Sequence, residues 1–223
     1  SFDWIGDTKI KIMQNIRSTF FKKKILIYGF AKSGSVSLEF LKKKKSKILC
    51  WDDSLLVRKK IKKKYLFNIE KKIPDNFFDY IFISPGINIR RCNLKNFLKK
   101  NKNKIITDLD IFYNYNKNSQ IISITGTNGK STTCKLLELV FKTAGYNVKL
   151  VGNIGKPILS IKKSNKKTII IVEVSSYQLE YMNDFNSKHA AILNISPDHM
   201  ERHKTMTNYI NAKIKILKFQ TSV

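Results

Sequence analysis

Cysteine, arginine and acidic residues are all scarce in this chain of 223 residues. Its three cysteines, Cys50, Cys92 and Cys134, are odd in number and widely spaced, which argues against a disulfide framework or a zinc knuckle. No apolar run approaches the roughly 20 residues that cross a bilayer. The first residues show neither the basic nor the apolar region of an export signal. We therefore expect a cytoplasmic protein that has no membrane partner.

The shortage of acidic residues, 16 against 43 Lys and Arg, gives a formal net charge of +27 at pH 7. Such an excess is typical of proteins that bind nucleic acid, because Lys and Arg neutralise phosphates. Only five of the 43 basic residues are Arg, although base readout favours Arg. Lysines also occur in runs at the ends of apolar segments, at 22–24, 42–45 and 62–64, which favours solvated faces. We expect no specific nucleic-acid partner.

Short apolar runs alternate with helical stretches from residue 24 onward, as in parallel sheets with crossover helices. Strands are predicted at 24–28, 47–51, 80–84, 104–106, 120–124, 147–151, 168–174 and 189–195. The polar stretch 114–119 interrupts this series, and the last helix is predicted near 207–219. The sequence therefore predicts an α/β fold with a Rossmann-like domain over 1–106. A P-loop-type ATPase domain, incomplete at its C-terminus, is predicted over 107–223.

The strongest chemical signal is a glycine loop between a predicted strand and a predicted helix. Its residues are Gly126, Thr127, Asn128, Gly129, Lys130, Ser131 and Thr132. A nucleoside triphosphate needs backbone N–H groups from a tight turn, a helix N-terminus, a Lys for the β/γ oxygens and a hydroxyl for Mg²⁺. All four parts occur here in order, although Ile124 stands where the longer form of the motif has its first glycine. We predict that this loop binds ATP.

Two weaker patterns accompany the loop. The segment 29–34 follows the first strand and is a degenerate dinucleotide fingerprint, with Asp52 about 20 residues on, where an acid contacts a ribose. An ordinary strand–helix turn is the alternative reading of this segment. The other pattern is a set of chemically capable side chains after later strands, namely Glu173, His199 and Lys213. Carboxylates at strand ends can meet a Mg²⁺ carried by phosphates, whereas a lone His is usually structural.

Four segments together resemble the Mur ligases of peptidoglycan synthesis. They are 126–132, 152–155 (Gly-Asn-Ile-Gly), 173–180 (Glu-Val-Ser-Ser-Tyr-Gln-Leu-Glu) and 194–203 (Asn-Ile-Ser-Pro-Asp-His-Met-Glu-Arg-His). Within that family, 84–87 and 175–180 are most similar to the members that add D-glutamate. The resemblance extends from about residue 24 to the last helix.

The resemblance implies an ATP-dependent amide ligase that joins D-glutamate to UDP-N-acetylmuramoyl-L-alanine through an acyl phosphate. It further implies a monomer that uses two Mg²⁺ ions, and family members are longer than this chain, so the 223 residues alone are expected to be inactive. Two alternatives stay open at this point. One is another Mur or folylpolyglutamate-type ligase, and the other, from a different class, is a basic ATP-binding nucleic-acid module.

Site residues also follow from the resemblance. Lys130 would hold the β/γ-phosphates, Ser131 and Glu173 the first Mg²⁺, and His199 a second Mg²⁺. Lys213 matches the family's carbamylated lysine, so Lys130, His199 and Lys213 form the predicted catalytic set. The residues that match substrate-binding positions are Ser33, Asp52, Asp53, Gly86 and Asn153. Asp53 departs from the family pattern, in which a hydroxyl residue is common.

Overall fold

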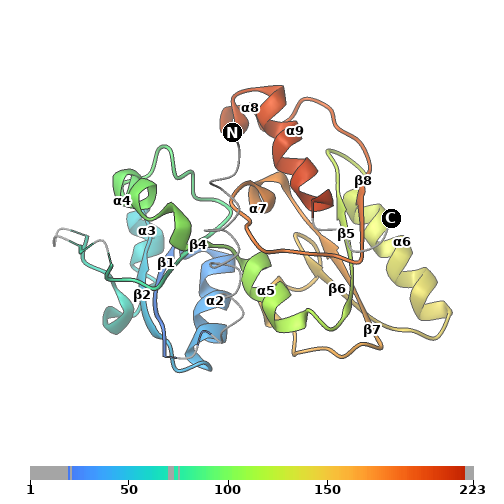
Figure 1. Cartoon of the computed structure of the whole chain (residues 1–223), viewed down its shortest axis with the longest axis horizontal. Coiled ribbons are helices and arrows are strands. Elements are labelled where there is room, and N and C mark those ends of the chain that lie inside the picture. The colour runs from blue at the N-terminus through green and yellow to red at the C-terminus, as the bar shows by residue number, and fades with distance from the viewer. Residues whose placement is uncertain (1–19, 21, 70–72, 75, 219–223) are drawn as a thin grey trace, which may run out of the picture. The chain divides into compact units, whose positions relative to one another are not determined.

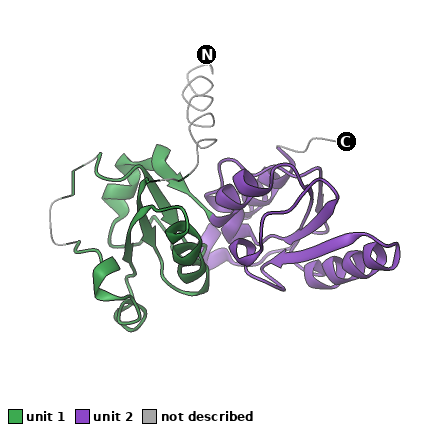
Figure 2. Cartoon of the chain, turned by 90° about the horizontal axis from the view of Figure 1, so that it is seen from below, with its two compact units in different colours: residues 1–107 green, residues 108–223 purple. Residues whose placement is uncertain are grey.

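The computed structural model describes residues 20, 22–69, 73–74 and 76–218. Expectations about the N-terminal residues 1–19, and about the last helix beyond 218, lie outside these residues. The chain divides into two compact units, residues 1–107 (unit 1) and residues 108–223 (unit 2), coloured green and purple in Figure 2. Each unit contains its own four-stranded parallel sheet with helices. The predicted α/β class is therefore confirmed.

Unit 1 is built on a parallel sheet of order β2-β1-β3-β4, in which β1, β2 and β4 are labelled in Figure 1. Its strands are β1 (Lys24–Tyr28), β2 (Lys47–Trp51), β3 (Tyr80–Ile83) and β4 (Ile105–Ile106). Its helices are α2 (Lys32–Lys42), α3 (Leu55–Arg58) and α4 (Lys95–Lys100), with 3₁₀ turns at η2 (Lys63–Tyr65) and η3 (Lys102–Lys104).

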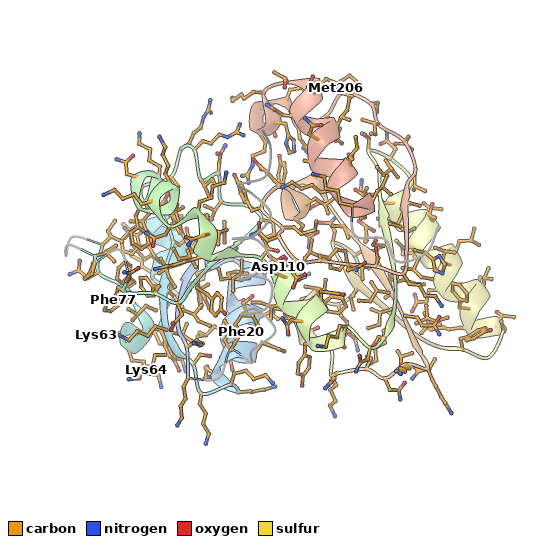
Figure 3. All side chains as sticks on the ribbon, viewed as in Figure 1. Phe20, Lys63, Lys64, Phe77, Asp110 and Met206 are labelled. Carbon is orange, nitrogen blue, oxygen red and sulfur yellow. The ribbon has the colours of Figure 1, made fainter. Side chains whose placement is uncertain are left out.

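Burial explains why the apolar runs of unit 1 form central strands. Residues 25–28 of β1 are fully buried, and all four residues of β3 are buried as well. Continuous apolar runs are typical of parallel strands, which are covered on both faces. Phe20 adds to this core through an edge-to-face contact with Tyr80 at 5.3 Å between ring centroids; Phe20 is labelled in Figure 3.

Unit 2 has the sheet order β6-β7-β5-β8, again all parallel. Its strands are β5 (Gln120–Thr125), β6 (Asn147–Gly152), β7 (Thr168–Glu173) and β8 (His189–Ile192). Its helices are α5 (Asp108–Asn116), α6 (Lys130–Thr143), α7 (Ser176–Glu180), α8 (Met200–His203) and α9 (Met206–Ile214), with 3₁₀ turns at η4 (Ile158–Ser160) and η5 (Lys215–Leu217).

Strand order places a topological switch point in each sheet. In unit 1 the chain passes from β1 to β2 on one side and to β3 on the other, and in unit 2 β8 lies on the opposite side of β5 from β7 and β6. Ligands of open α/β sheets bind beyond the carboxyl ends of the strands at such points. The loops after β1, β3, β5 and β8 are therefore where function is expected.

Helix α5 differs from the sequence prediction, which took the polar stretch 114–119 as a break. The helix runs through Asn116, because Leu109, Ile111 and Phe112 of the same helix are completely buried. Asp110, labelled in Figure 3, accepts hydrogen bonds from the backbone N–H groups of Asn183 and Asp184 at 2.8 and 2.6 Å. Tertiary contacts therefore override the weak local preference of Asn and Tyr for this helix.

Strand β8 is also shorter than predicted, since it ends at Ile192 rather than at 195. Leu193 still donates its N–H to the Thr125 carbonyl at 2.9 Å. The next residue, Asn194, instead forms hydrogen bonds with the loop after β5. None of the described helices has the length and apolar character needed to cross a membrane.

Candidate active site

The loop after β5 leads directly into α6, a helix of 14 residues. Gly129 precedes the helix with φ = +79°, in the left-handed region that favours glycine. The ammonium of Lys130 donates to the carbonyl oxygens of Gly126 and Thr127 at 2.8 and 2.7 Å. The first N–H groups of a helix lack intrahelical partners and bear partial positive charge, so this loop has the chemistry of an anion site.

Asn194, which follows β8, braces that loop. Its side-chain oxygen accepts the backbone N–H groups of Thr127 and Asn128 at 3.1 and 2.9 Å. Its side-chain nitrogen donates to the Asn128 carbonyl at 3.1 Å. Sequence reasoning did not single out Asn194 as a site residue, although a polar amide directly after a strand beside the glycine loop was the available signal.

The Thr127 hydroxyl adds a second brace from the C-terminal part of unit 2. It donates to the Ser196 carbonyl at 3.2 Å and accepts the Ser196 N–H at 3.0 Å. It also lies 3.1 Å from the hydroxyl of Tyr209 in α9. The loop geometry is therefore held by the segment after β8 and by α9, as well as by its own glycines.

Glu173 ends β7 and brings a carboxylate to the start of α6. The side chain is 1% exposed, and its Oε2 accepts the Ser131 hydroxyl at 2.8 Å. Its Oε1 accepts the side-chain amide of Asn153 at 3.0 Å. A hydroxyl and a carboxylate that converge beside a phosphate-type loop are a donor set that suits Mg²⁺, which prefers oxygen ligands and completes its shell with phosphate oxygens and water.

Lys213 of α9 reaches the same loop from inside the unit. The residue is 1% exposed, and its Nζ donates to the Gly126 carbonyl at 2.7 Å. Burial, together with the positive charge of Lys130, lowers the pKa of Lys213 from 10.5 to about 8. A neutral amine is therefore accessible to Lys213 near physiological pH, unlike an ordinary lysine.

His199 lies on an exposed turn just before α8. Its backbone is left-handed, with φ = +55°, and its side chain is 45% exposed. The ring nitrogens lie 3.4 Å from the Asp198 carboxylate and 3.8 Å from that of Glu201, and the ring is 4.8 Å from Tyr177. The contacts recorded for His199 are therefore with these neighbours rather than with the glycine loop.

Buried polar contacts join α7 to α8 and were not anticipated from the sequence. Arg202 forms an ion pair with Glu180 at 2.7 Å, with the two side chains 6% and 12% exposed. The buried His203 lies 3.0 Å from the Ser176 hydroxyl, and burial lowers the pKa of His203. These contacts tie the segment after β7 to the segment that carries His199.

In unit 1, the predicted substrate residues follow β1, β2 and β3, in the loops or in the first turn of the next helix. Gly29 has φ = +93°, and a Cβ there would lie 2.6 Å from the Cβ of Ser84, whose hydroxyl donates to the Gly29 carbonyl at 2.7 Å. Asp52 accepts the backbone N–H groups of Phe30 and Ser54 at 2.7 and 2.9 Å. Ser33 lies in the first turn of α2, and a Cβ at Gly86 would meet open space.

Asp53 has a different environment from Asp52. Its carboxylate accepts the Tyr28 hydroxyl at 2.7 Å and the Trp51 indole N–H at 3.1 Å. It also accepts the backbone N–H of Asn93 at 3.1 Å. These contacts tie the ends of β1 and β2 to the segment before α4, so Asp53 has a structural role in unit 1.

Comparison with known proteins places these motifs in a wider context. Residues 124–222 match the model of the family described as Mur ligase middle domain. The chain is 37% identical over 205 residues to the UDP-N-acetylmuramoylalanine–D-glutamate ligase of Caldicellulosiruptor bescii, covering 88% of this chain and 45% of that protein. It is 38% identical over 199 residues to the ligase of the same name from Rickettsia bellii, covering 87% and 43%. The chain thus spans less than half the length of these relatives.

Among solved structures, the chain is similar to UDP-N-acetylmuramate:L-alanyl-γ-D-glutamyl-meso-diaminopimelate ligase from Neisseria meningitides. The TM-score is 0.53 at 14% sequence identity, covering 89% of this chain and 68% of that one. At this identity the likeness concerns the fold.

Proposed function

The chain belongs to the Mur ligase family, and from this premise we propose that it is part of an ATP-dependent ligase that adds D-glutamate to UDP-N-acetylmuramoyl-L-alanine. In this reaction the substrate carboxylate attacks the γ-phosphorus of ATP and ADP leaves. The amine of D-glutamate then attacks the acyl phosphate, and inorganic phosphate leaves. We further propose that the protein acts in the cytoplasm as a monomer.

The observation that carries the proposal is the convergence of Lys130, Ser131 and Glu173 at the start of α6. Lys130 would exchange its bonds to the loop carbonyls for bonds to the β/γ-phosphates, where its charge offsets the negative charge that shifts to ADP. The remaining loop residues, Gly126, Thr127, Asn128, Gly129 and Thr132, would form the rest of the phosphate site around the N-terminus of α6.

Ser131 and Glu173 are the residues that would hold Mg²⁺ with ATP, and His199 would contribute to a second ion. A bound Mg²⁺ supplies charge neutralisation at the phosphate oxygens. Ser131 and Glu173 present their oxygens 2.8 Å apart from two different elements. His199 presents its ring at an exposed turn close to Asp198, which leaves it accessible to a ligand.

Lys213 is proposed to carry a carbamate, formed when its neutral amine attacks CO₂ and loses a proton. The lowered pKa of about 8 makes the neutral form available. The carbamate would bring a negative charge to a site that already holds the ammonium of Lys130, which favours the modification.

Unit 1 is proposed to bind the uridine diphosphate part of the substrate. The proposed contacts are Ser33, Asp52, Asp53 and Gly86, and Asn153 of unit 2 is the further substrate-binding position implied by the family resemblance. Titration of the ¹⁵N-labelled chain with UDP should shift the amide signals of Gly34, Asp52 and Gly86. If those signals do not move, unit 1 has another role.

The nucleotide site is tested with Lys130→Ala. Its loss should weaken binding of a fluorescent ATP analogue by about 1.5–3 kcal/mol, the range for hydrogen bonds to charged groups. Lys142→Ala is the matched control, since Lys142 lies at the other end of α6 and pairs with Glu138 at 2.7 Å. Equal affinities for the two variants would refute the assignment of the loop.

A further inference from the structure

We propose that Asn153 is a positioning residue that aims the Glu173 carboxylate at Ser131, in addition to any contact it makes with substrate. The inference rests on the proposed function in one respect: Glu173 and Ser131 are the pair assigned to the Mg²⁺ of the nucleotide. The geometry of the pair is independent of that assignment.

Asn153 contacts Glu173 at two points. Its backbone N–H donates to the Glu173 carbonyl at 3.0 Å, and its side-chain amide donates to Oε1 at 3.0 Å. The Ser131 hydroxyl donates to the other carboxylate oxygen, Oε2, at 2.8 Å. The carboxylate therefore has a donor on each oxygen, from two separate elements, and this arrangement fixes the rotation of its plane.

Glycines make this approach possible. Gly152 ends β6 with φ = +115°, and a Cβ there would lie 2.2 Å from the Glu173 carbonyl oxygen. Gly155 has φ = +71°, and a Cβ there would lie 2.8 Å from the Leu150 carbonyl oxygen. The Gly152 N–H donates to the Lys156 carbonyl at 3.1 Å, which closes the loop. The loop 152–156 therefore folds back on β6 and brings Asn153 to the end of β7.

Burial makes the contact consequential. Glu173 is 1% exposed, so a carboxylate oxygen that loses its protein donor there has little water to replace it. The side chain would then turn toward whatever donor remains. Residues that hydrogen-bond to a metal-ligating side chain commonly set its orientation, and their loss lowers metal affinity about 10–100-fold.

The experiment compares Asn153→Ala with Asn147→Ala in the 223-residue chain. Asn147 begins β6, the strand that precedes Asn153, and its side-chain amide donates to Thr168 at 3.4 Å, at the other end of that strand. Binding of a fluorescent ATP analogue is measured with and without Mg²⁺. Asn153→Ala should weaken binding about 10–100-fold with Mg²⁺ and leave the metal-free affinity unchanged. Asn147→Ala should change neither affinity.

A second measurement uses no nucleotide or metal. In ¹⁵N spectra, Glu173→Gln should shift the side-chain amide signals of Asn153 and leave those of Asn147 in place. If the Asn153 signals do not respond, or if Asn153→Ala weakens binding equally with and without Mg²⁺, the positioning role is wrong. If the parent chain shows no Mg²⁺-dependent nucleotide binding, the proposed function fails, and the spectra still decide whether Asn153 positions Glu173.

Discussion

Lys213 is the residue whose chemistry is changed most by its surroundings. Lys213 is 1% exposed, and its Nζ donates to the Gly126 carbonyl. The positive charge of Lys130 also acts on it. Burial and the positive charge of Lys130 both disfavour the ammonium form, so the pKa of Lys213 falls from 10.5 to about 8. The folded protein therefore holds a lysine in the range where an amine can act as a nucleophile.

Stability should depend on pH through this residue. Between pH 8 and 10.5 the folded chain has released the Lys213 proton while the unfolded chain keeps it, so the free energy of unfolding rises with pH in that window. Across this window, the free energy of unfolding of the parent chain should rise by on the order of 2–3 kcal/mol relative to that of Lys213→Met. Urea unfolding in CO₂-free buffer measures it. Parallel curves for the two proteins would contradict the lowered pKa.

Asp53 shows a carboxylate used inside the fold. Asp53→Ala would leave the Tyr28 hydroxyl and the Trp51 N–H without their acceptor, which should cost about 1–3 kcal/mol of unfolding free energy. Trp51 ends β2 of unit 1, so its fluorescence in urea reports on the unfolding of this unit. Glu39→Gln, an exposed partner of Lys42, is the control and should stay within about 0.5 kcal/mol. Equal stabilities of the two variants would show that Asp53 is dispensable to the fold.

At the scale of elements, caps and an ion pair hold the short helices that follow the strands of unit 2. Ser175 and Gln178 form a capping box at the start of α7, and Thr205 caps α9 by accepting the Asn208 N–H at 3.1 Å. Arg202 of α8 pairs with Glu180 of α7. Short helices of four to nine residues are marginal alone, so these caps and pairs hold them in place.

Gly152→Ala should disrupt the junction of β6 and β7. The new Cβ would lie 2.2 Å from a backbone oxygen at a residue with φ = +115°, so the strand end has to move. We expect a loss of more than about 2 kcal/mol of unfolding free energy, since backbone strain alone costs roughly 1–3 kcal/mol. Thermal unfolding followed by circular dichroism tests this. Gly86→Ala, whose Cβ meets open space, is the control, and a Gly152→Ala protein as stable as that control would refute the steric argument.

At the scale of the whole molecule, the net charge of +27 attracts polyanions such as DNA to the protein. Exposed lysines produce non-specific attraction that salt screens. A nucleic-acid-binding module, the alternative class considered for this sequence, would also lose affinity steeply as salt rises, but it would still bind tightly at physiological salt.

Salt separates these two cases. We expect weak retention of duplex DNA at about 50 mM salt that falls roughly 10³-fold or more by about 200 mM, because the contacts are to phosphates alone. DNA should not displace the ATP analogue at the higher salt concentration, because the ATP site is a discrete loop. Tight DNA binding at about 200 mM salt that competes with the nucleotide would favour the nucleic-acid module.

Local sequence patterns were sufficient to predict the positions of the buried strands and the glycine loop. Runs such as 25–28 and 169–172 are apolar on every residue, and only strands covered on both faces bury them, so their positions followed from the sequence. The loop 126–132 was recognisable because its glycines, lysine and serine are contiguous. The resemblance to the Mur ligases followed from motifs of the same local kind, and residues 124–222 match the model of the Mur ligase middle domain.

Tertiary structure decided the rest, because it concerns residues far apart in the chain. Helix α5 persists through Asn116 since its apolar side is buried in unit 2, which no local propensity reports. Asn194 braces Thr127 and Asn128 across 66–67 positions of sequence, and Asn153 meets Glu173 across 20. Such contacts depend on strand order and on which loops share one edge of a sheet. Hydrophobic periodicity specifies each strand separately, and only the order of the strands brings these side chains together.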